Sequence, residues 1–426
     1  MLTSVALLTS LLAGCSSEAG NSTDRSTEEE TTLTILIGET SRANVEAVAK
    51  LVEEKHGIKT EFETSPGGSE GDNIVKTRLA TGDMTDLLYY NSGSLLQALN
   101  PERNFMDLTN EPFMENVLDS FKESVTVKDK VFGIPAAPIG VGGWFYNKKV
   151  YNELGLTVPK TWDELMENNK KIKEAGKTAV IGSYKDTWTS QMVVLSDNHN
   201  VMSEEPDFAE NYTANKAKMA TTPAALRSFE KLQELNDRKF FNEDYMATNL
   251  DAGLKMLAEG TGVHYPMVSV VIPLLAQNYP EQANDIGVFP QPGDHAETNG
   301  FTAWVPNAIY VNKNSKHADA AKKWVETSLS PEGVKAYQSA SKLEGPLAIK
   351  DFELPEDVFA FVKDMMPFIE NNQTTPALEF LSPVKGPSLE QITVEIGSGI
   401  KTAEEGAKAY DRDVEKQAKQ LGLEGW

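Results

Sequence analysis

The chain has 426 residues, which exceeds the length at which a single hydrophobic core keeps growing, so two packed units are expected. Its 63 acidic and 40 basic side chains give a formal net charge of -23, which disfavours binding to nucleic-acid phosphates or anionic lipid head groups. Apolar residues make up 40% and charged residues 24%, a balance typical of globular proteins and unlike that of disordered or membrane-spanning chains.

The chain begins with a short apolar segment that ends at its single cysteine. Leu12-Ala13-Gly14-Cys15 resembles a lipobox, in which the thiol receives a diacylglyceryl group and a signal peptidase cuts before the cysteine. The segment is shorter than the about 20 apolar residues of a membrane-spanning helix. We therefore expect residues 1–14 to be a removed signal peptide and Cys15 to be lipidated, which anchors the mature protein to the cell membrane on its extracytoplasmic side. The segment lacks the Lys or Arg with which signal peptides normally begin, so an upstream translation start is the alternative.

The residues after the cysteine have the composition of a linker. Residues 16–32 are mostly Ser, Thr, Glu, Asn and Gly without apolar periodicity, so they bury too little surface to offset their ordering entropy. We expect residues 15–32 to be a flexible, lipid-anchored tether. With one cysteine the chain forms no internal disulfide, so its stability depends on burial.

The next part of the chain is predicted to form a β-α-β unit. Residues 32–37 are a β-branched run typical of a buried strand. A helix follows, whose apolar residues recur at helical spacing: Val45, Val48, Leu51 and Val52. Gly57 supplies a left-handed residue at its end, and residues 58–63 predict a second, parallel strand. Residues 87–90 predict a third strand, and Asp86 just before it is expected to accept hydrogen bonds from backbone amides. The pattern indicates an open α/β sheet.

Later helices are marked by capping signals. Thr161 and Glu164 predict a capping box, in which a hydroxyl and a carboxylate satisfy amides at the helix start, and residues 402–405 repeat it. Ser330 and Pro331 supply a cap and a first-turn proline. Two tryptophans lie on the apolar stripes of predicted helices and are expected in the core: Trp162 and Trp324. The C-terminal helix has an apolar face formed by Ala407, Tyr410, Val414 and Leu421.

Three segments of the sequence carry a family resemblance: residues 131–165, 81–90 and 285–333. Residues 131–135 (VFGIP), 144–148 (WFYNK) and 154–165 (LGLTVPKTWDEL) are similar in order and spacing to the YGIP, YNKD and P-x-TWDEL blocks of the family 1 extracellular solute-binding proteins, which include maltose-binding protein. Residues 81–90 resemble the family's strand with an aromatic at its end, although the family more often has proline in place of Thr85. A third similar block spans residues 285–333, so the resemblance covers nearly the whole chain after Leu33.

The resemblance implies a two-lobed α/β fold of the type II periplasmic-binding-protein class, with the ligand in a cleft between the lobes. It places residues 33–139 and 298–332 in lobe 1, and residues 140–297 and 333–426 in lobe 2. The hinge crossings are expected at three places: residues 139–143, 290–299 and 330–337. Each contains Gly or Pro, which absorb backbone rotation at hinges but also occur in ordinary surface turns.

Aromatic and polar side chains suited to a carbohydrate lie near predicted strand ends. A sugar presents apolar C–H faces, which aromatic rings cover, and hydroxyls, which amides and carboxylates bind. Tyr90 or Asn91 is expected to face the cleft, and of Tyr89 and Tyr90 only one can do so, because adjacent strand residues point oppositely. The resemblance adds candidates from other loops: Glu39, Thr40, Trp144, Trp188, Tyr265, Trp304 and Glu344. Without the resemblance, the three tryptophans among them would be assigned to cores.

The sequence contains no pattern of catalytic or metal-binding residues. The five histidines are scattered without metal-ligand spacing, and no nucleophile elbow occurs, so we expect no catalytic residue, metal or cofactor. We expect a monomeric receptor that captures a carbohydrate, most simply an oligosaccharide, and delivers it to the permease of an ABC importer. Two alternatives stay open: the same fold binding a non-sugar such as a polyamine or an amino-acid derivative, and a lipid-anchored carbohydrate hydrolase with two carboxylates flanking a groove.

Overall fold

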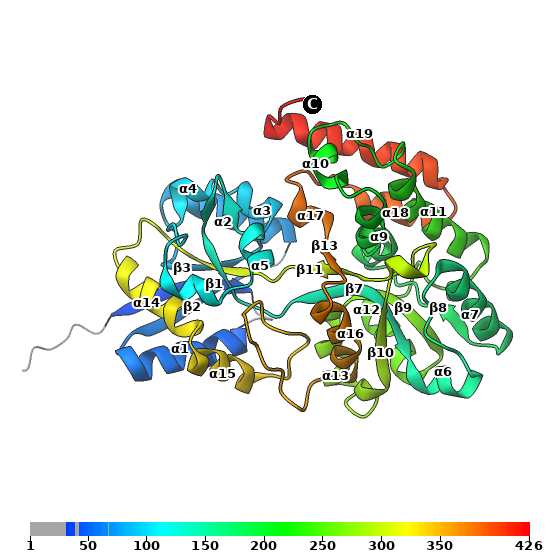
Figure 1. Cartoon of the computed structure of the whole chain (residues 1–426), viewed down its shortest axis with the longest axis horizontal. Helices are drawn as coiled ribbons and strands as arrows, with labels where there is room; N and C mark the ends of the chain where they lie inside the picture. Colours follow the sequence, from blue (N-terminus) through cyan, green and yellow to red (C-terminus); the bar gives the residue numbers. More distant parts are fainter. Residues whose placement is uncertain (1–30, 39–41, 67) are drawn as a thin grey trace, which may run out of the picture. The chain divides into compact units, whose positions relative to one another are not determined.

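Two β-sheets organise the chain in the computed structural model, which describes residues 31–38, 42–66 and 68–426 (Figure 1). The first sheet has the strand order β2-β1-β3-β12-β6, and its strands in that order are Lys59–Ser65, Thr32–Gly38, Leu87–Tyr90, Ala308–Val311 and Gly133–Pro135. β1 pairs in parallel with β2 and β3, whereas β12 is antiparallel to β3 and β6. The predicted parallel β-α-β unit is therefore confirmed, with the second strand starting one residue later than expected.

The first lobe consists of this sheet and the helices that cover it. α1 (Arg42–His56) buries Val45, Val48 and Val52, packs against α14 (Ala318–Ser328) and α15 (Pro331–Ala340), and ends before Gly57, whose φ is 66°. Trp324 on α14 is buried, as predicted, and donates from Nε1 to Thr60 Oγ1 at 3.1 Å. The lobe also contains α2 (Gly68–Thr81), α3 (Ser94–Gln97), α4 (Pro101–Asn104), α5 (Asp119–Ser124) and a hairpin of β4 (Thr126–Val127) with β5 (Lys130–Val131).

The second lobe is built around β7, a fully buried strand that pairs antiparallel with β9, β10 and β11. The strands are β7 (Gly140–Asn147), β8 (Thr178–Val180), β9 (Gly262–Val268), β10 (Ile286–Pro290), β11 (Phe301–Trp304) and β13 (Thr374–Pro376). Helices surround this sheet: α6 (Lys148–Leu154), α7 (Trp162–Glu174), α8 (Met192–Leu195), α9 (Asn198–Glu204), α10 (Phe208–Thr213), α11 (Pro223–Asp237), α12 (Leu250–Glu259), α13 (Ile272–Asn278), α16 (Ala360–Glu370), α17 (Leu378–Leu381), α18 (Leu389–Gly397) and α19 (Ala403–Leu421). Because both faces of the sheet are covered, β7 and β9 are buried along their whole length.

The predicted helix caps form, with one variation. Thr402 and Glu405 make the full reciprocal capping box of α19. At α7, Thr161 caps Glu164 N, but the Glu164 carboxylate accepts from Lys160 N at 2.7 Å and not from the Thr161 amide. Trp162 is buried as predicted. The prediction for Leu421 is wrong, because this last residue of α19 lies beyond the packed face and is 42% exposed.

The chain passes between the two sheets at places that differ from two of the expected crossings. Within the described residues, the first passage joins β6 to β7 through residues 136–139 and overlaps the expected residues 139–143 at Ile139. The second is residues 305–307, not 290–299, because β10 and β11 both pair with β7 in the second sheet. The third lies between Ala348, in the first core, and Val358, in the second, because α15 stays packed on α1. Strand pairing thus places residues 298–304 in the second lobe, and core packing places residues 333–348 in the first.

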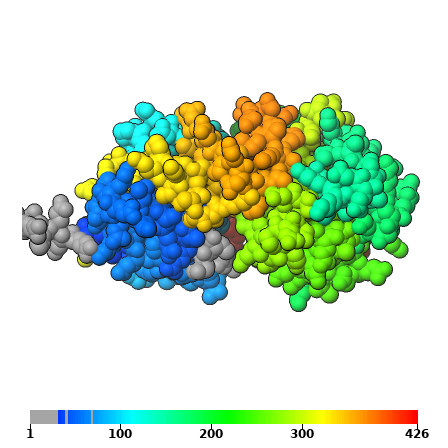
Figure 2. Space-filling view, turned by 90° about the horizontal axis from the view of Figure 1, so that it is seen from below, coloured from blue at the N-terminus to red at the C-terminus, as the bar shows by residue number. Residues whose placement is uncertain are grey.

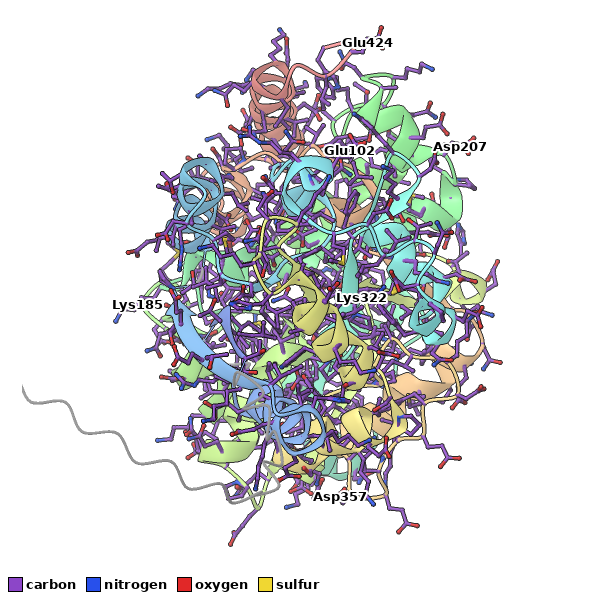
Figure 3. All side chains as sticks on the ribbon, turned by 90° about the vertical axis from the view of Figure 1, so that its left-hand side faces the viewer. Glu102, Lys185, Asp207, Lys322, Asp357 and Glu424 are labelled. Carbon is purple, nitrogen blue, oxygen red and sulfur yellow. The ribbon has the colours of Figure 1, made fainter. Side chains whose placement is uncertain are left out.

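The surface of the described part is rich in acidic side chains. Asp207, Asp357 and Glu424 are exposed, and Figure 3 labels them. Among the described helices, none is both long and apolar enough to cross a membrane. The predicted signal peptide, the tether and Cys15 lie outside the described residues, apart from the last two residues of the tether.

Candidate functional site

The second passage brings together two of the predicted site residues. Ala308, the first residue of β12, pairs with Tyr90 in the first sheet, and Trp304, the last residue of β11, pairs with Gly140 in the second. Trp304 and Ala308 are four residues apart, so an extended chain separates them by only about 13 Å. Ser92, just after Tyr90, donates from Oγ to Pro306 O at 3.2 Å. The end of β3 and the end of β11 therefore flank the same stretch of chain, and Figure 2 shows the surface hollowed between the two lobes.

The Trp304 side chain on β11 lies next to two glycines of the neighbouring strand β7. A Cβ atom at Gly142 would lie 2.4 Å from Trp304 Cζ3, and one at Gly140 would lie 3.5 Å from Trp304 Cβ. Glycine at these positions of β7 lets the indole approach the backbone. The ring remains partly exposed and packs against the apolar cluster that contains Val141 and Met267. Trp304 thus has a supported side and an accessible side, as a stacking ring requires.

Trp188 packs against the same apolar cluster as Trp304 and is also partly exposed. It lies in a short 3-10 helix, Thr187–Gln191, which two side chains fix to α18. Thr187 Oγ1 donates to Glu390 Oε2 at 2.6 Å, and Ser190 Oγ lies 2.7 Å from Thr393 Oγ1. The structure therefore packs two predicted aromatic residues, 116 positions apart in sequence, against one hydrophobic core of the second lobe.

Tyr90 is nearly buried and is held by a hydrogen bond from its hydroxyl. It is 6% exposed, and its hydroxyl donates to Asp72 Oδ1 at 2.6 Å. Burial and the neighbouring Asp72 carboxylate raise the pKa of Tyr90, so it stays protonated. Asn91 is partly exposed, and its carbonyl accepts from Tyr310 Oη at 2.8 Å. Asp72 on α2, which sequence reasoning missed, is held at the end of β3 by this bond.

Two predicted site residues belong to the core of the second lobe in this structure. Trp144 is 0% exposed, donates to Gln291 Oε1 and is flanked by Trp162 at 6.1 Å between ring centroids. Tyr265 is 1% exposed, and its hydroxyl lies 2.6 Å from Ser183 Oγ. Neither ring presents a face to a ligand, because helices cover both faces of the strands that carry them.

The remaining predicted residues are acidic or polar. Glu344 is partly buried on the segment that runs beside the first passage, where Ile139 N donates to Pro346 O at 2.7 Å. Burial raises the pKa of Glu344 to about 7. Glu39 and Thr40 lie outside the described residues.

A contact between the lobes lies close to these residues and was not predicted. Gly93, two residues after Asn91, has a φ of 66°, and a Cβ there would lie 2.9 Å from Phe380 Cα and from its ring. Phe380 belongs to α17 of the second lobe and is partly exposed. The contact joins positions nearly 290 residues apart, and no local pattern signals it. Phe380 is therefore a further aromatic beside the candidate site.

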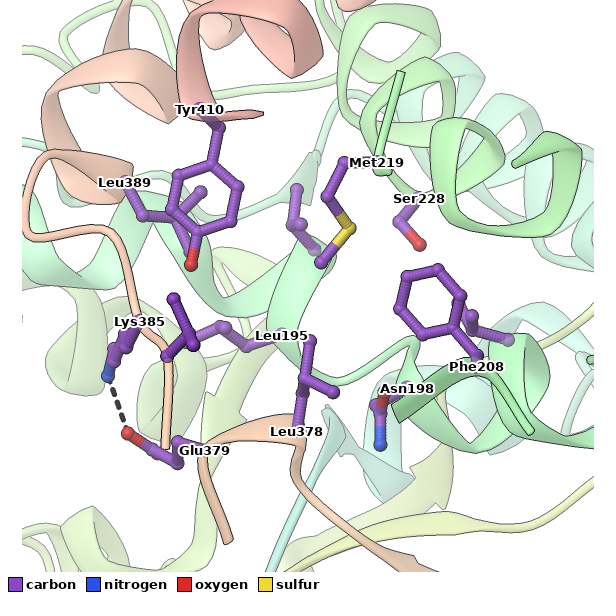
Figure 4. Close-up of a pocket in the computed structure, with 13 residues that line it drawn as sticks. Leu195, Asn198, Phe208, Met219, Ser228, Leu378, Glu379, Lys385, Leu389 and Tyr410 are labelled. Atoms are coloured by element: carbon purple, nitrogen blue, oxygen red, sulfur yellow. Dashed lines mark hydrogen bonds and ion pairs between the residues drawn. The ribbon is translucent and has the colours of Figure 1, made fainter. Parts of the chain in front are cut away.

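A small pocket behind α17 does not suit a sugar. It has a volume of about 40 Å³ and is lined mainly by aliphatic and aromatic side chains, among them Leu195, Phe208 and Leu378 (Figure 4). Its charged side chains, Glu379 and Lys385, pair with each other at 2.6 Å. With few free polar groups to bind hydroxyls, it is a packing space next to the candidate site. In the described part of the chain, no group of three or more His, Cys, Asp or Glu side chains is placed to hold a metal ion.

Comparisons with known proteins agree with this architecture. A family model described as bacterial extracellular solute-binding protein matches residues 38–335. The multiple sugar-binding protein of Streptococcus mutans is 24% identical over 287 residues, which are 65% of this chain and 66% of that protein. The melibiose/raffinose/stachyose-binding protein of Bacillus subtilis is 20% identical over 380 residues, 83% of this chain and 84% of that protein.

Solved structures share the fold. The apo-form of RafE from Streptococcus pneumoniae has a TM-score of 0.75 at 20% identity, covering 90% of this chain and 98% of that one. An open conformation of a binding protein from Bacillus subtilis has a TM-score of 0.76 at 16% identity, covering 92% of this chain and 99% of that one. The predicted α/β binding-protein fold is confirmed.

Proposed function

Because the chain belongs to the family of bacterial extracellular solute-binding proteins, we propose that it captures a carbohydrate between its two lobes and delivers it to the permease of an ABC importer. The family consists of binding proteins, so the chain is a receptor and not an enzyme. The observation that carries the carbohydrate proposal is two partly exposed rings, Trp188 and Trp304, that pack against one hydrophobic core of the second lobe, with Trp304 next to the interlobe passage. Relatives whose names specify multiple sugars, raffinose and stachyose support this ligand class.

The proposed site combines rings from the second lobe with polar groups from the first. Trp188 and Trp304 would cover the C–H faces of the sugar, while Asp72, Asn91 and Glu344 would bind hydroxyls. Glu39 and Thr40 are retained as candidates on the family resemblance. Closure follows if the sugar binds more tightly to the state in which both sets of groups contact it. Phe380 of the second lobe already packs against Gly93 of the first lobe. In the closed state this contact between the lobes would be retained.

Substitution of the stacking tryptophans tests the proposal. Trp304→Ala and Trp188→Ala should each weaken binding of raffinose or stachyose about tenfold or more, because a lost ring contact removes roughly 1.5–3 kcal/mol. Isothermal titration calorimetry measures the affinity. The matched control is Trp426→Ala, since Trp426 is partly exposed but packs on Tyr212 in a different cluster, and it should leave affinity unchanged.

The ligand class is tested by a thermal-shift screen of the wild-type protein. A bound solute raises the melting temperature according to the logarithm of its concentration over its dissociation constant. Stabilisation by oligosaccharides without release of reducing sugar supports the receptor. Stabilisation by polyamines or amino-acid derivatives alone would mean that the ligand is a non-sugar solute. Release of reducing sugar would mean that the protein is a hydrolase.

We also propose that the mature protein is a monomer tethered to the membrane by a lipid on Cys15. The lipobox-like residues 12–15 and the single cysteine support this anchor. The full chain expressed in a bacterial host should incorporate radiolabelled palmitate and partition with membranes. Cys15→Ser should abolish both, and unchanged membrane association of this variant would contradict the anchor.

A further inference from the structure

A buried ion pair lies within the second lobe. Lys231 on α11 and Asp197, just before α9, are both 1% exposed, and Lys231 Nζ lies 2.7 Å from Asp197 Oδ1. The ammonium group also donates to Pro292 O at 3.0 Å. Ions withdrawn from water are stable only when their remaining hydrogen-bonding capacity is also used.

Three linked side chains around this pair each leave one polar atom without a protein partner in the described part of the chain. Asp197 Oδ1 accepts from Asn200 Nδ2 at 2.6 Å, and the same amide donates to Gln291 O at 3.0 Å. Gln291 Oε1 accepts from Trp144 Nε1. The unpaired atoms are Asp197 Oδ2, Asn200 Oδ1 and Gln291 Nε2. Two of them are acceptors and one is a donor, and all three residues are at most 5% exposed.

We propose that this cluster is a binding site for ordered water, in which at least one molecule bridges Asp197 Oδ2, Asn200 Oδ1 and Gln291 Nε2. A water molecule donates to the two oxygens and accepts from the amide, so it matches the unpaired set, and buried waters occupy polar sites with two to four such partners. A metal cation does not match, because Gln291 Nε2 cannot ligate it and the Lys231 ammonium repels it. Gly293 gives this side of the site its room, since a Cβ there would lie 2.7 Å from Asn200 Oδ1.

The hydrated cluster is connected to the wall of the proposed sugar site. Thr302 Oγ1 donates to Ser196 O at 2.7 Å and accepts from His199 N at 2.9 Å. Thr302 lies two residues before Trp304 on β11 and is itself 0% exposed. Water that satisfies Asp197 and Asn200 therefore helps to fix the segment on which β11 rests.

A high-resolution crystal structure of the wild-type protein tests the proposal directly. We expect solvent density within about 2.7–3.2 Å of at least two of the three unpaired atoms. Density that contacts oxygens only, at about 2.3–2.6 Å, would identify a cation and overturn the assignment to water. A direct bond between Gln291 Nε2 and Asp197 Oδ2 with no density between them would overturn the site itself.

Oxygen-17 relaxation dispersion in solution tests the same site without a crystal. Asn200→Leu removes the unpaired acceptor together with the amide that donates to Asp197 Oδ1 and Gln291 O, and it fills the space with an apolar side chain of similar size. It should therefore lose at least one long-lived water relative to wild type. Asn371→Leu, at an exposed amide of the same lobe, is the matched control and should lose none. An unchanged count in a folded Asn200→Leu protein would overturn the proposal, and if this variant does not fold, the wild-type crystal decides. Neither outcome depends on whether the protein binds sugar.

Discussion

The carboxylate of Asp86 joins three parts of the first lobe at the start of β3. Its Oδ2 accepts from Thr34 N at 2.8 Å and from Thr34 Oγ1 at 2.9 Å, while its Oδ1 accepts from Ser315 Oγ at 2.5 Å. Asp86→Ala should lower the free energy of unfolding by about 1.5–3 kcal/mol, because the bonds to a charged group are lost and the Thr34 amide is left unpaired. Urea titration measures this change. Asp357→Ala, at an exposed carboxylate, should change it by less than about 0.5 kcal/mol, and equal effects of the two variants would contradict the role of Asp86.

Whether the role of a single residue could be predicted from the sequence depends on where the residue lies in its helix or strand. The role of Asp86 followed from a short polar side chain next to a buried strand, and Trp162 and Trp324 followed from helical stripes. Trp144 and Tyr265 lie on strands covered on both faces, where alternation does not separate a ligand side from a core side. Their burial depends on helices that pack from distant parts of the chain, so a strand pattern alone could not exclude them from the site.

Two adjacent glycines of β7 should respond differently to substitution, because their neighbours differ. In Gly142→Ala the new Cβ meets Trp304 Cζ3 at 2.4 Å and Ser196 Oγ at 2.6 Å, both ends of side chains that can move. We expect a stability loss of about 1 kcal/mol, together with weaker sugar binding because the Trp304 ring is displaced. In Gly143→Ala the Cβ meets the backbone oxygen of Phe289 at 2.6 Å, so β7 and β10 must separate at a cost of about 3 kcal/mol.

Urea unfolding and calorimetric titration of both glycine variants separate these effects. Normal sugar affinity in Gly142→Ala would show that the position of Trp304 does not matter for binding. Equal stability losses in the two variants would show that moving the β10 backbone costs no more free energy than moving the Trp304 side chain.

Elements whose signals are local were predictable, and those that depend on pairing were not. β1, α1, β3 and the caps of α7, α15 and α19 follow from runs of up to about 15 residues. The sequence predicts the second hinge crossing too early, at residues 290–299, because Gly and Pro are common both in hinges and in surface loops. Only the pairing of β11 with β7, across more than 150 residues, shows that the chain is still in the second lobe there.

At the scale of the whole molecule, the buried His264 and the partly buried Glu344 should give opposing contributions to stability as the pH falls. Burial lowers the pKa of His264 from 6.5 to about 3, so the unfolded chain takes up the proton first and stability is lost below about pH 6.5. Burial raises the pKa of Glu344 from 4.5 to about 7, so the folded chain takes up the proton first and stability is gained as the pH falls from about 7 to 4.5. Each slope is about 1.4 kcal/mol per pH unit, so between about pH 4.5 and 6.5 they nearly cancel.

When either side chain is replaced, the unfolding free energy should change with pH according to the remaining group alone. Relative to wild type, Glu344→Gln should lose about 3 kcal/mol of unfolding free energy between pH 6.5 and 4.5, because the His264 contribution is no longer offset. His264→Asn should gain a similar amount over the same range. The other charged side chains are the same in all three proteins, so the difference between each variant and wild type isolates the deleted group. Urea titrations at half-unit steps of pH measure these differences, and variant curves that run parallel to wild type would show that His264 and Glu344 titrate alike in the folded and unfolded chains.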